Sequence, residues 1–129
     1  MPTMTSHAPG NFCWFELATN DQNAAKDFYS KVFGWGISDN PMGPDMVYTT
    51  LTKDGKSVAA LYGLDKAQLE RGGPPHWNAY ISTANVDETT KKAETLGGTA
   101  IMQPFDVMEF GRMSVIQDPT GAMIAFWQS

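Results

Sequence analysis

The chain has 129 residues, of which 42% are hydrophobic and 18% are charged, and its formal net charge is −5 at pH 7. This length is enough for one globular domain with a sizeable core, without a disulfide or a structural metal. The basic residues are scattered, which excludes the dense positive patch that nucleic-acid binding requires. No apolar run reaches membrane-spanning length and the first residues lack a secretory pattern, so we expect a cytoplasmic protein without a membrane partner.

The first predicted strand covers residues 12–19 and follows an N-terminal arm, residues 1–10, that we expect to be flexible. Because side chains alternate along a strand, Trp14 and Glu16 lie on one face and Cys13 lies on the other. Cys13 is the only cysteine, so the chain cannot form an internal disulfide. Its place in an apolar strand favours a buried structural thiol over a reactive one.

An amphipathic helix is predicted after this strand. Asn20 and Asp21 offer side-chain oxygens to the unpaired amides of a helix start, and Gly34 is typical of a helix end. The apolar residues that recur between them at helical spacing are Ala25, Phe28, Tyr29 and Val32. Residues 36–45 are rich in Gly, Pro, Asn and Asp, and we interpret them as a loop after a short strand or edge segment.

Two further strands complete the first half, over residues 46–52 and 57–63. The Asp54-Gly55 pair between them is a hairpin-turn signal, so the first half has the order β-α-β-β-β. Residues 65–75 end in a run of Gly and Pro and are predicted to be a linker.

The second half repeats this order. It is predicted to contain a strand over residues 77–83, a helix capped by Asp87, and strands over residues 99–103, 111–117 and 122–127. The helix side chains expected to face the sheet are Val86, Thr89, Ala93 and Leu96, and residues 118–121 form a turn. Several residue pairs share a spacing of 64 positions, for example Leu17 with Ile81 and Gly34 with Gly98, which indicates a duplicated module.

Three segments carry a resemblance to a known family, namely DFYSKVFGW, DETTKKAETLGG and DPTGAMIAFWQ. They resemble the vicinal oxygen chelate superfamily, which includes glyoxalase I, extradiol dioxygenases, methylmalonyl-CoA epimerase and the bleomycin-resistance proteins. The resemblance implies an α+β fold with one domain over residues 11–128. Its two βαβββ modules, residues 11–64 and 76–128, would be joined by the linker at 65–75, with mixed sheets curled around a cleft. It also implies a homodimer in which a second chain covers open sheet edges.

Enzymes of that family hold a divalent metal with side chains from four strands, and the matching positions here lack suitable donors. These positions are Trp14, the strand over residues 57–63, Asn78 and Ala125. Divalent transition metals need imidazole or carboxylate donors that converge from several sides. We therefore expect no metal and no other cofactor. His76, two residues before Asn78, is the nearest alternative donor, and the predicted domain contains no second His to accompany it.

The same resemblance places one set of alternating side chains in the cleft. They are Trp14, Glu16, Asn78, Tyr80, Met123 and Trp127. Aromatic side chains and methionine around one carboxylate and one amide suit a small, largely apolar or aromatic ligand. Tyr48 and Tyr62 are expected in the core or at the rim.

Glu16 has two readings. A carboxylate among aromatic groups loses hydration and could act as a general base or, when protonated, as a hydrogen-bond donor. Alternatively, it is a structural group that accepts a hydrogen bond from a neighbouring Tyr or pairs with Arg112, which could itself clamp an anion.

Two functions therefore remain open. The first is metal-independent binding of a small molecule, as in the family's antibiotic-resistance members. The second is lyase, isomerase or dioxygenase activity on a small carbonyl or phenolic substrate, with Glu16 as the base or with a metal held at other positions.

Overall fold

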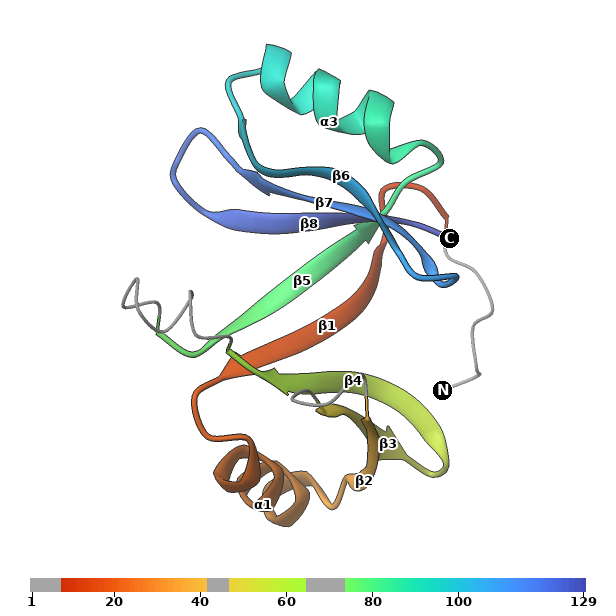
Figure 1. The fold of residues 1–129 in the computed structure, drawn as a ribbon, viewed down its shortest axis with the longest axis vertical. Coiled ribbons are helices and arrows are strands. Elements are labelled where there is room, and N and C mark those ends of the chain that lie inside the picture. The colour runs from red at the N-terminus through yellow and green to blue at the C-terminus, as the bar shows by residue number, and fades with distance from the viewer. Residues whose placement is uncertain (1–7, 42–46, 65–73) are drawn as a thin grey trace. The chain divides into compact units, whose positions relative to one another are not determined.

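The computed structural model describes residues 8–41, 47–64 and 74–129. In chain order the described elements are β1 (Phe12–Thr19), α1 (Gln22–Phe33), β2 (Gly36–Pro41), β3 (Val47–Lys53), β4 (Lys56–Gly63), β5 (His76–Ser82), α3 (Val86–Thr95), β6 (Thr99–Val107), β7 (Gly111–Gln117) and β8 (Met123–Gln128) (Figure 1). The order β-α-β-β-β occurs twice, which confirms the predicted α+β fold of two βαβββ modules. Most of the predicted arm and linker lies outside the described residues.

These residues fall into two compact units, which are described separately. The N-terminal unit comprises Phe15–Trp77, and the C-terminal unit comprises the residues up to Trp14 together with Asn78–Ser129. The strand order is β2-β3-β4-β1 in the first unit and β6-β7-β8-β5 in the second. In each unit the last pair, β1 with β4 or β5 with β8, is parallel and the other pairs are antiparallel.

Helix α1 covers one face of the sheet in the N-terminal unit. Its start is fixed by Asp21, whose side chain accepts a hydrogen bond from the Ala24 amide at 3.0 Å, and Gly34 ends it in the left-handed conformation, as predicted. The core beneath the helix contains Leu17, Leu51, Ala59 and Leu61, with Ala25 and Tyr29 packed against it. Burial of this apolar surface attaches the helix to the sheet.

Only part of the predicted apolar stripe of α1 is used in packing. Ala25 and Tyr29 pack against the core, whereas Phe28 and Val32 remain 58% and 54% exposed. One prediction for this unit was wrong. Gly36–Pro41 was interpreted as part of a loop, yet it forms β2 and pairs with β3 along its whole length. Tertiary pairing outweighs the low strand propensity of its Gly, Asp, Asn and Pro residues.

Helix α3 lies over β6, β7 and β8 in the C-terminal unit (Figure 1). Its cap is Asn85, which accepts from the Glu88 amide at 3.1 Å, and not the predicted Asp87. Val86 is buried as predicted, but the other buried residue of the helix is Thr90 and not Thr89, and Leu96 is 70% exposed instead of facing the sheet.

The strands of the C-terminal unit agree with the prediction except in β6. This strand continues to Val107, beyond the predicted end at Gln103, and its pairing with β7 is irregular between Ala100 and Phe105. Such irregularities let a strand that contains Pro104 stay at a sheet edge. The predicted turn over residues 118–121 is present, with the Asp118 carboxylate accepting from the Thr120 and Ala122 amides.

Candidate functional site

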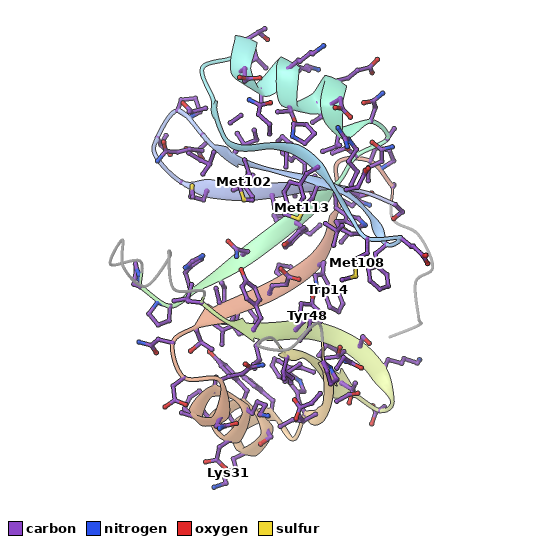
Figure 2. All side chains as sticks on the ribbon, viewed as in Figure 1. Trp14, Lys31, Tyr48, Met102, Met108 and Met113 are labelled. Atoms are coloured by element: carbon purple, nitrogen blue, oxygen red, sulfur yellow. The ribbon has the colours of Figure 1, made fainter. Side chains whose placement is uncertain are left out.

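The C-terminal unit has an apolar sheet face opposite α3. Ser114 lies on the α3 side, because its hydroxyl is 2.8 Å from that of Thr90, so alternation along β7 puts Met113 and Val115 on the other side. Strand pairing adds Trp127 opposite Met113, and Ala125 between Val115 and Tyr80. Figure 2 shows Met102 and Met113 on this side, away from α3. We call this surface, which consists of Tyr80, Met102, Met113, Val115, Met123, Ala125 and Trp127, the apolar face.

An aromatic pair forms the centre of the apolar face. The rings of Tyr80 and Trp127 meet edge to face, with centroids 6.3 Å apart at an interplanar angle of 73°. Tyr80 is buried while Trp127 is half-buried, so the indole keeps surface for contact with another molecule. The structure therefore brings together two of the residues predicted to bind ligand.

The other predicted residues of this unit lie on β1, β5 and β8. Asn78 is half-buried and lies two residues before Tyr80 on β5, which gives it the same strand face. Met123, at the start of β8, is 52% exposed, and Trp14 is half-buried in β1. Met102 and Met113 were not among the predicted site residues, because the pairing of β6 with β7 and of β7 with β8 decides that they join the face.

Glu16 belongs to the N-terminal unit, on the sheet face opposite α1. Its carboxylate accepts a hydrogen bond from the Tyr48 hydroxyl, so one of its partners is a Tyr, and this contact does not decide between the two roles expected for Glu16. Glu16 pairs with Ala60 on β4, and Ala60 pairs with Thr50 on β3, so Tyr48 reaches Glu16 diagonally across the central strand. Tyr48, expected only in the core or at the rim, is thus part of this candidate site.

Arg112 has carboxylate partners within the C-terminal unit. Its guanidinium donates to both oxygens of Asp87 at 2.8 and 3.0 Å and to Asp106 at 3.1 Å. These hydrogen bonds raise the pKa of Arg112 above its usual value and lower the pKa of Asp87. Sequence reasoning offered Glu16 or an anionic ligand as its partner, whereas this arrangement joins α3, β6 and β7.

The residues at the family's metal positions do not fit a divalent ion. Ala125 has no donor atom, the Trp14 indole offers no lone pair for a metal, and Asn78 has only an amide. Among the described residues, no group of three or more His, Cys, Asp and Glu side chains is placed to hold a metal ion. His76, the alternative donor, is exposed and has its Nδ1 atom 2.8 Å from the Pro74 carbonyl oxygen.

Comparison with known proteins matches this arrangement to a family. The model of the Glyoxalase/Bleomycin resistance protein/Dioxygenase superfamily matches residues 11–126. The chain belongs to this superfamily. The predicted resemblance is therefore confirmed.

Similar proteins of the superfamily carry several names. The chain is 43% identical over 130 residues to "Putative glyoxylase CFP32" of Mycobacterium tuberculosis, with 100% of the chain and 49% of that protein covered. It is 41% identical over 140 residues to "Anthracycline biosynthesis protein DauV" of a Streptomyces species, with 97% and 49% covered. The chain thus spans about half the length of these curated relatives.

Solved structures of the superfamily share the fold at low sequence identity. Methylmalonyl-CoA epimerase from Mycobacterium tuberculosis matches with a TM-score of 0.68 and 14% identity, over 98% of this chain and 92% of that one. The Streptomyces coelicolor epimerase in complex with methylmalonyl-CoA matches with a TM-score of 0.63 and 18% identity, over 95% and 96%. Neither described helix of the present chain is long and apolar enough to cross a membrane.

Proposed function

We propose that this chain binds a small, largely apolar or aromatic molecule on its apolar face, without a metal ion. The observation that carries the proposal is the Tyr80–Trp127 pair with Met113 paired opposite Trp127. Aromatic rings and polarizable methionine side chains form adaptable surfaces for flat apolar molecules. Asn78, on the same strand face as Tyr80, supplies an amide that orients a polar group of the ligand.

A pair of matched substitutions tests the proposed face. Met113→Gln places a polar amide on the face while nearly keeping side-chain length, so it should weaken binding of a two-ring aromatic such as naphthalene by about tenfold. Met108→Gln makes the same chemical change at a methionine that is 67% exposed and lies in the turn after β6, and should leave the affinity unchanged. Equal affinities for both variants, measured by equilibrium dialysis, would overturn the proposal.

Thermal unfolding with added metals tests the metal-independent part. A ligand that binds only the native state raises the melting temperature of the protein. If the chain binds no metal, nickel, zinc, manganese and iron(II) should each leave that temperature unchanged. A large increase with one of these ions would require donors outside the family positions.

A second candidate is an enzyme acting on a small carbonyl or phenolic substrate. The name of the 43% identical relative, which calls that protein a glyoxylase, favours this candidate. The Glu16–Tyr48 hydrogen bond supports it as well, because a held carboxylate can take up a proton. Turnover that is present in the wild type and lost in Glu16→Gln would establish it, whereas equal turnover in both proteins would exclude Glu16 as the base.

We also propose that the chain forms a homodimer. Strands β2 and β6 lie at the two ends of the strand order, but they carry Pro41 and Pro104, which disfavour pairing with another strand. Side-chain contacts would then hold the dimer, and the exposed Phe28 and Phe33 of α1 are available for them. Sedimentation equilibrium should give twice the chain mass, and a monomer at micromolar concentration would contradict this proposal.

A further inference from the structure

We infer that Gly111 positions the indole of Trp127 as a platform for two-ring aromatic ligands, and that it thereby sets which apolar molecules the apolar face prefers. The inference rests on the proposed function, because it names the ligand class of the same face. All the residues that carry it belong to the C-terminal unit. Gly111 was not among the predicted site residues.

Position 111 needs a glycine because of the space around it, and not because of its backbone conformation. A Cβ atom added there would lie 2.5 Å from Cζ2 and 2.9 Å from Cε2 of Trp127, and 2.5 Å from the carbonyl oxygen of Gln128. Carbon atoms that are not bonded pack at about 3.5–4.0 Å. The backbone φ of Gly111 is not positive, so other residues could adopt its conformation. The six-membered ring of the indole therefore occupies the space that a side chain at position 111 would fill.

Strand pairing explains how the indole reaches this place. Trp127 on β8 lies directly opposite Met113 on β7, and Gly111 is two residues before Met113, which gives it the same sheet face. On the other side of β8, the ring of Tyr80 on β5 meets the indole edge to face. The indole thus lies across the sheet, with Tyr80 on one side and Gly111 under its six-membered ring.

An indole in this position favours ligands with more than one ring. Trp127 is half-buried and so keeps surface for contact with another molecule. Offset stacking on an aromatic ring and the burial of apolar area both increase with the number of fused rings in the ligand. A two-ring molecule can cover the indole and also contact Met113 beside it, whereas a single ring covers only part of this surface. The apolar face should therefore prefer two-ring molecules.

Naphthalene and toluene, which have two rings and one ring, test this preference. The wild-type chain should bind naphthalene about tenfold more tightly than toluene. Trp127→Phe keeps one aromatic ring but removes the ring atoms that lie over Gly111, so the ratio of the two affinities should fall about fivefold. Equilibrium dialysis measures both affinities. An unchanged ratio in Trp127→Phe would overturn the inference.

A second substitution tests Gly111 itself. Gly111→Ala must displace the indole, so the ratio should fall about threefold or more. Gly63→Ala is the matched control, because a Cβ atom there would meet only Oε1 of Gln22, at 3.6 Å, and it should leave the ratio unchanged. An unchanged ratio in Gly111→Ala would overturn the positioning role.

The carbonyl oxygen of Gln128 gives Gly111→Ala a second effect, because the backbone of β8 must also shift. A role confined to the backbone would change stability, measured by urea unfolding, and would weaken both probes alike. In a chain that already carries Trp127→Phe, adding Gly111→Ala should lower the ratio no further, since the ring that it displaces is gone. A further fall in that background would assign the effect to the backbone and overturn the positioning role. If Gly111→Ala does not fold, the ratio in Trp127→Phe decides.

The proposed function fails separately. If Met113→Gln weakens naphthalene binding relative to Met108→Gln while Trp127→Phe and Gly111→Ala keep the wild-type ratio, the proposed function stands and the role of Gly111 is wrong. If the wild-type chain binds neither naphthalene nor toluene, both are wrong.

Discussion

The two units share one strand order but differ on the sheet face opposite their helices. In the N-terminal unit that face holds the hydrogen-bonded Glu16 and Tyr48. In the C-terminal unit the equivalent places hold Tyr80 and Met113 beside Trp127. The two units thus share one pairing register and differ in the side chains on one sheet face, so the fold alone does not fix which side chains that face carries.

The helix-facing sides differ as well, although both are required for stability. In the N-terminal unit this side is an apolar core around Leu51 and Leu61. In the C-terminal unit it includes a buried polar pair, Thr90 and Ser114. The first core gains stability by excluding water from apolar surface, and the second also depends on the correct placement of two hydroxyl groups. These differences predict different responses to substitution.

The largest expected effect is in the apolar core of the N-terminal unit. Leu61 is fully buried, so Leu61→Ala removes buried surface and leaves a cavity, and should cost about 2–5 kcal/mol of unfolding free energy. The same change at Leu96, which is 70% exposed, should cost less than about 0.5 kcal/mol. Urea unfolding followed by circular dichroism measures both, and similar losses for the two variants would contradict the assignment of this core.

A smaller effect is expected from the polar pair in the C-terminal unit. The Thr90 hydroxyl donates to the Val86 carbonyl at 2.6 Å, so Ser114 must be the donor in the Thr90–Ser114 contact. Thr90→Val leaves a buried O–H donor without this acceptor and should cost about 1–3 kcal/mol, more than Ser114→Ala. The double variant should lose less than the two single losses together, and strict additivity in urea unfolding would argue against the hydrogen bond.

Much of the fold was predictable because each module carries strong local signals. Asp21 and Gly34 mark the ends of α1, and the turn over residues 118–121 separates β7 from β8. The errors occurred where a tertiary contact outweighs a local preference. Gly36–Pro41 has the composition of a loop and becomes β2 through its pairing with β3. Asp87 was expected to cap α3, but its carboxylate accepts hydrogen bonds from Arg112 of β7 instead.

The candidate site was less predictable than the fold. The family resemblance, extended by strand alternation, grouped Tyr80 with Trp127, and the two rings do meet, because the parallel pairing of β5 with β8 sets them on neighbouring strands. Met113 and Tyr48 were not among the predicted site residues, because each lies on a neighbouring strand and a single sequence does not give the register between strands. Ala60 lies between Glu16 and Thr50 in the sheet, and its small side chain is the one feature that could have indicated Tyr48 as a partner of Glu16.

A surface carboxylate provides a still smaller effect, and one that depends on pH. Hydrogen bonds from Thr49 and Lys26 hold the pKa of Asp39 below its usual value of about 3.9. A carboxyl group whose pKa is lower in the folded state stabilises the fold above its unfolded-state pKa. This stabilisation is lost as the pH falls through the folded-state pKa. Asp39→Asn should therefore lower the free energy of unfolding in urea at pH 7 by no more than about 1 kcal/mol, because the group is exposed, and this effect should disappear near pH 2. Glu94→Gln is the control, and an Asp39→Asn effect that grew on acidification would contradict the sign.

The smallest effect concerns reactivity and leaves stability unchanged. The Cys13 thiol contacts the Tyr80 carbonyl oxygen at 3.5 Å, and burial raises the pKa of this thiol. Because the thiolate is the reactive form, the native chain at pH 8 should react with a disulfide reagent severalfold more slowly than the urea-unfolded chain. This test also concerns the apolar face, because Tyr80 forms the ring pair of that face. A ligand bound there should slow the reaction of Cys13 further. Equal rates in native and unfolded chains would mean that this part of β1 is not held against β5, and the apolar face would then lack the fixed Tyr80 on which the proposed ligand binding depends.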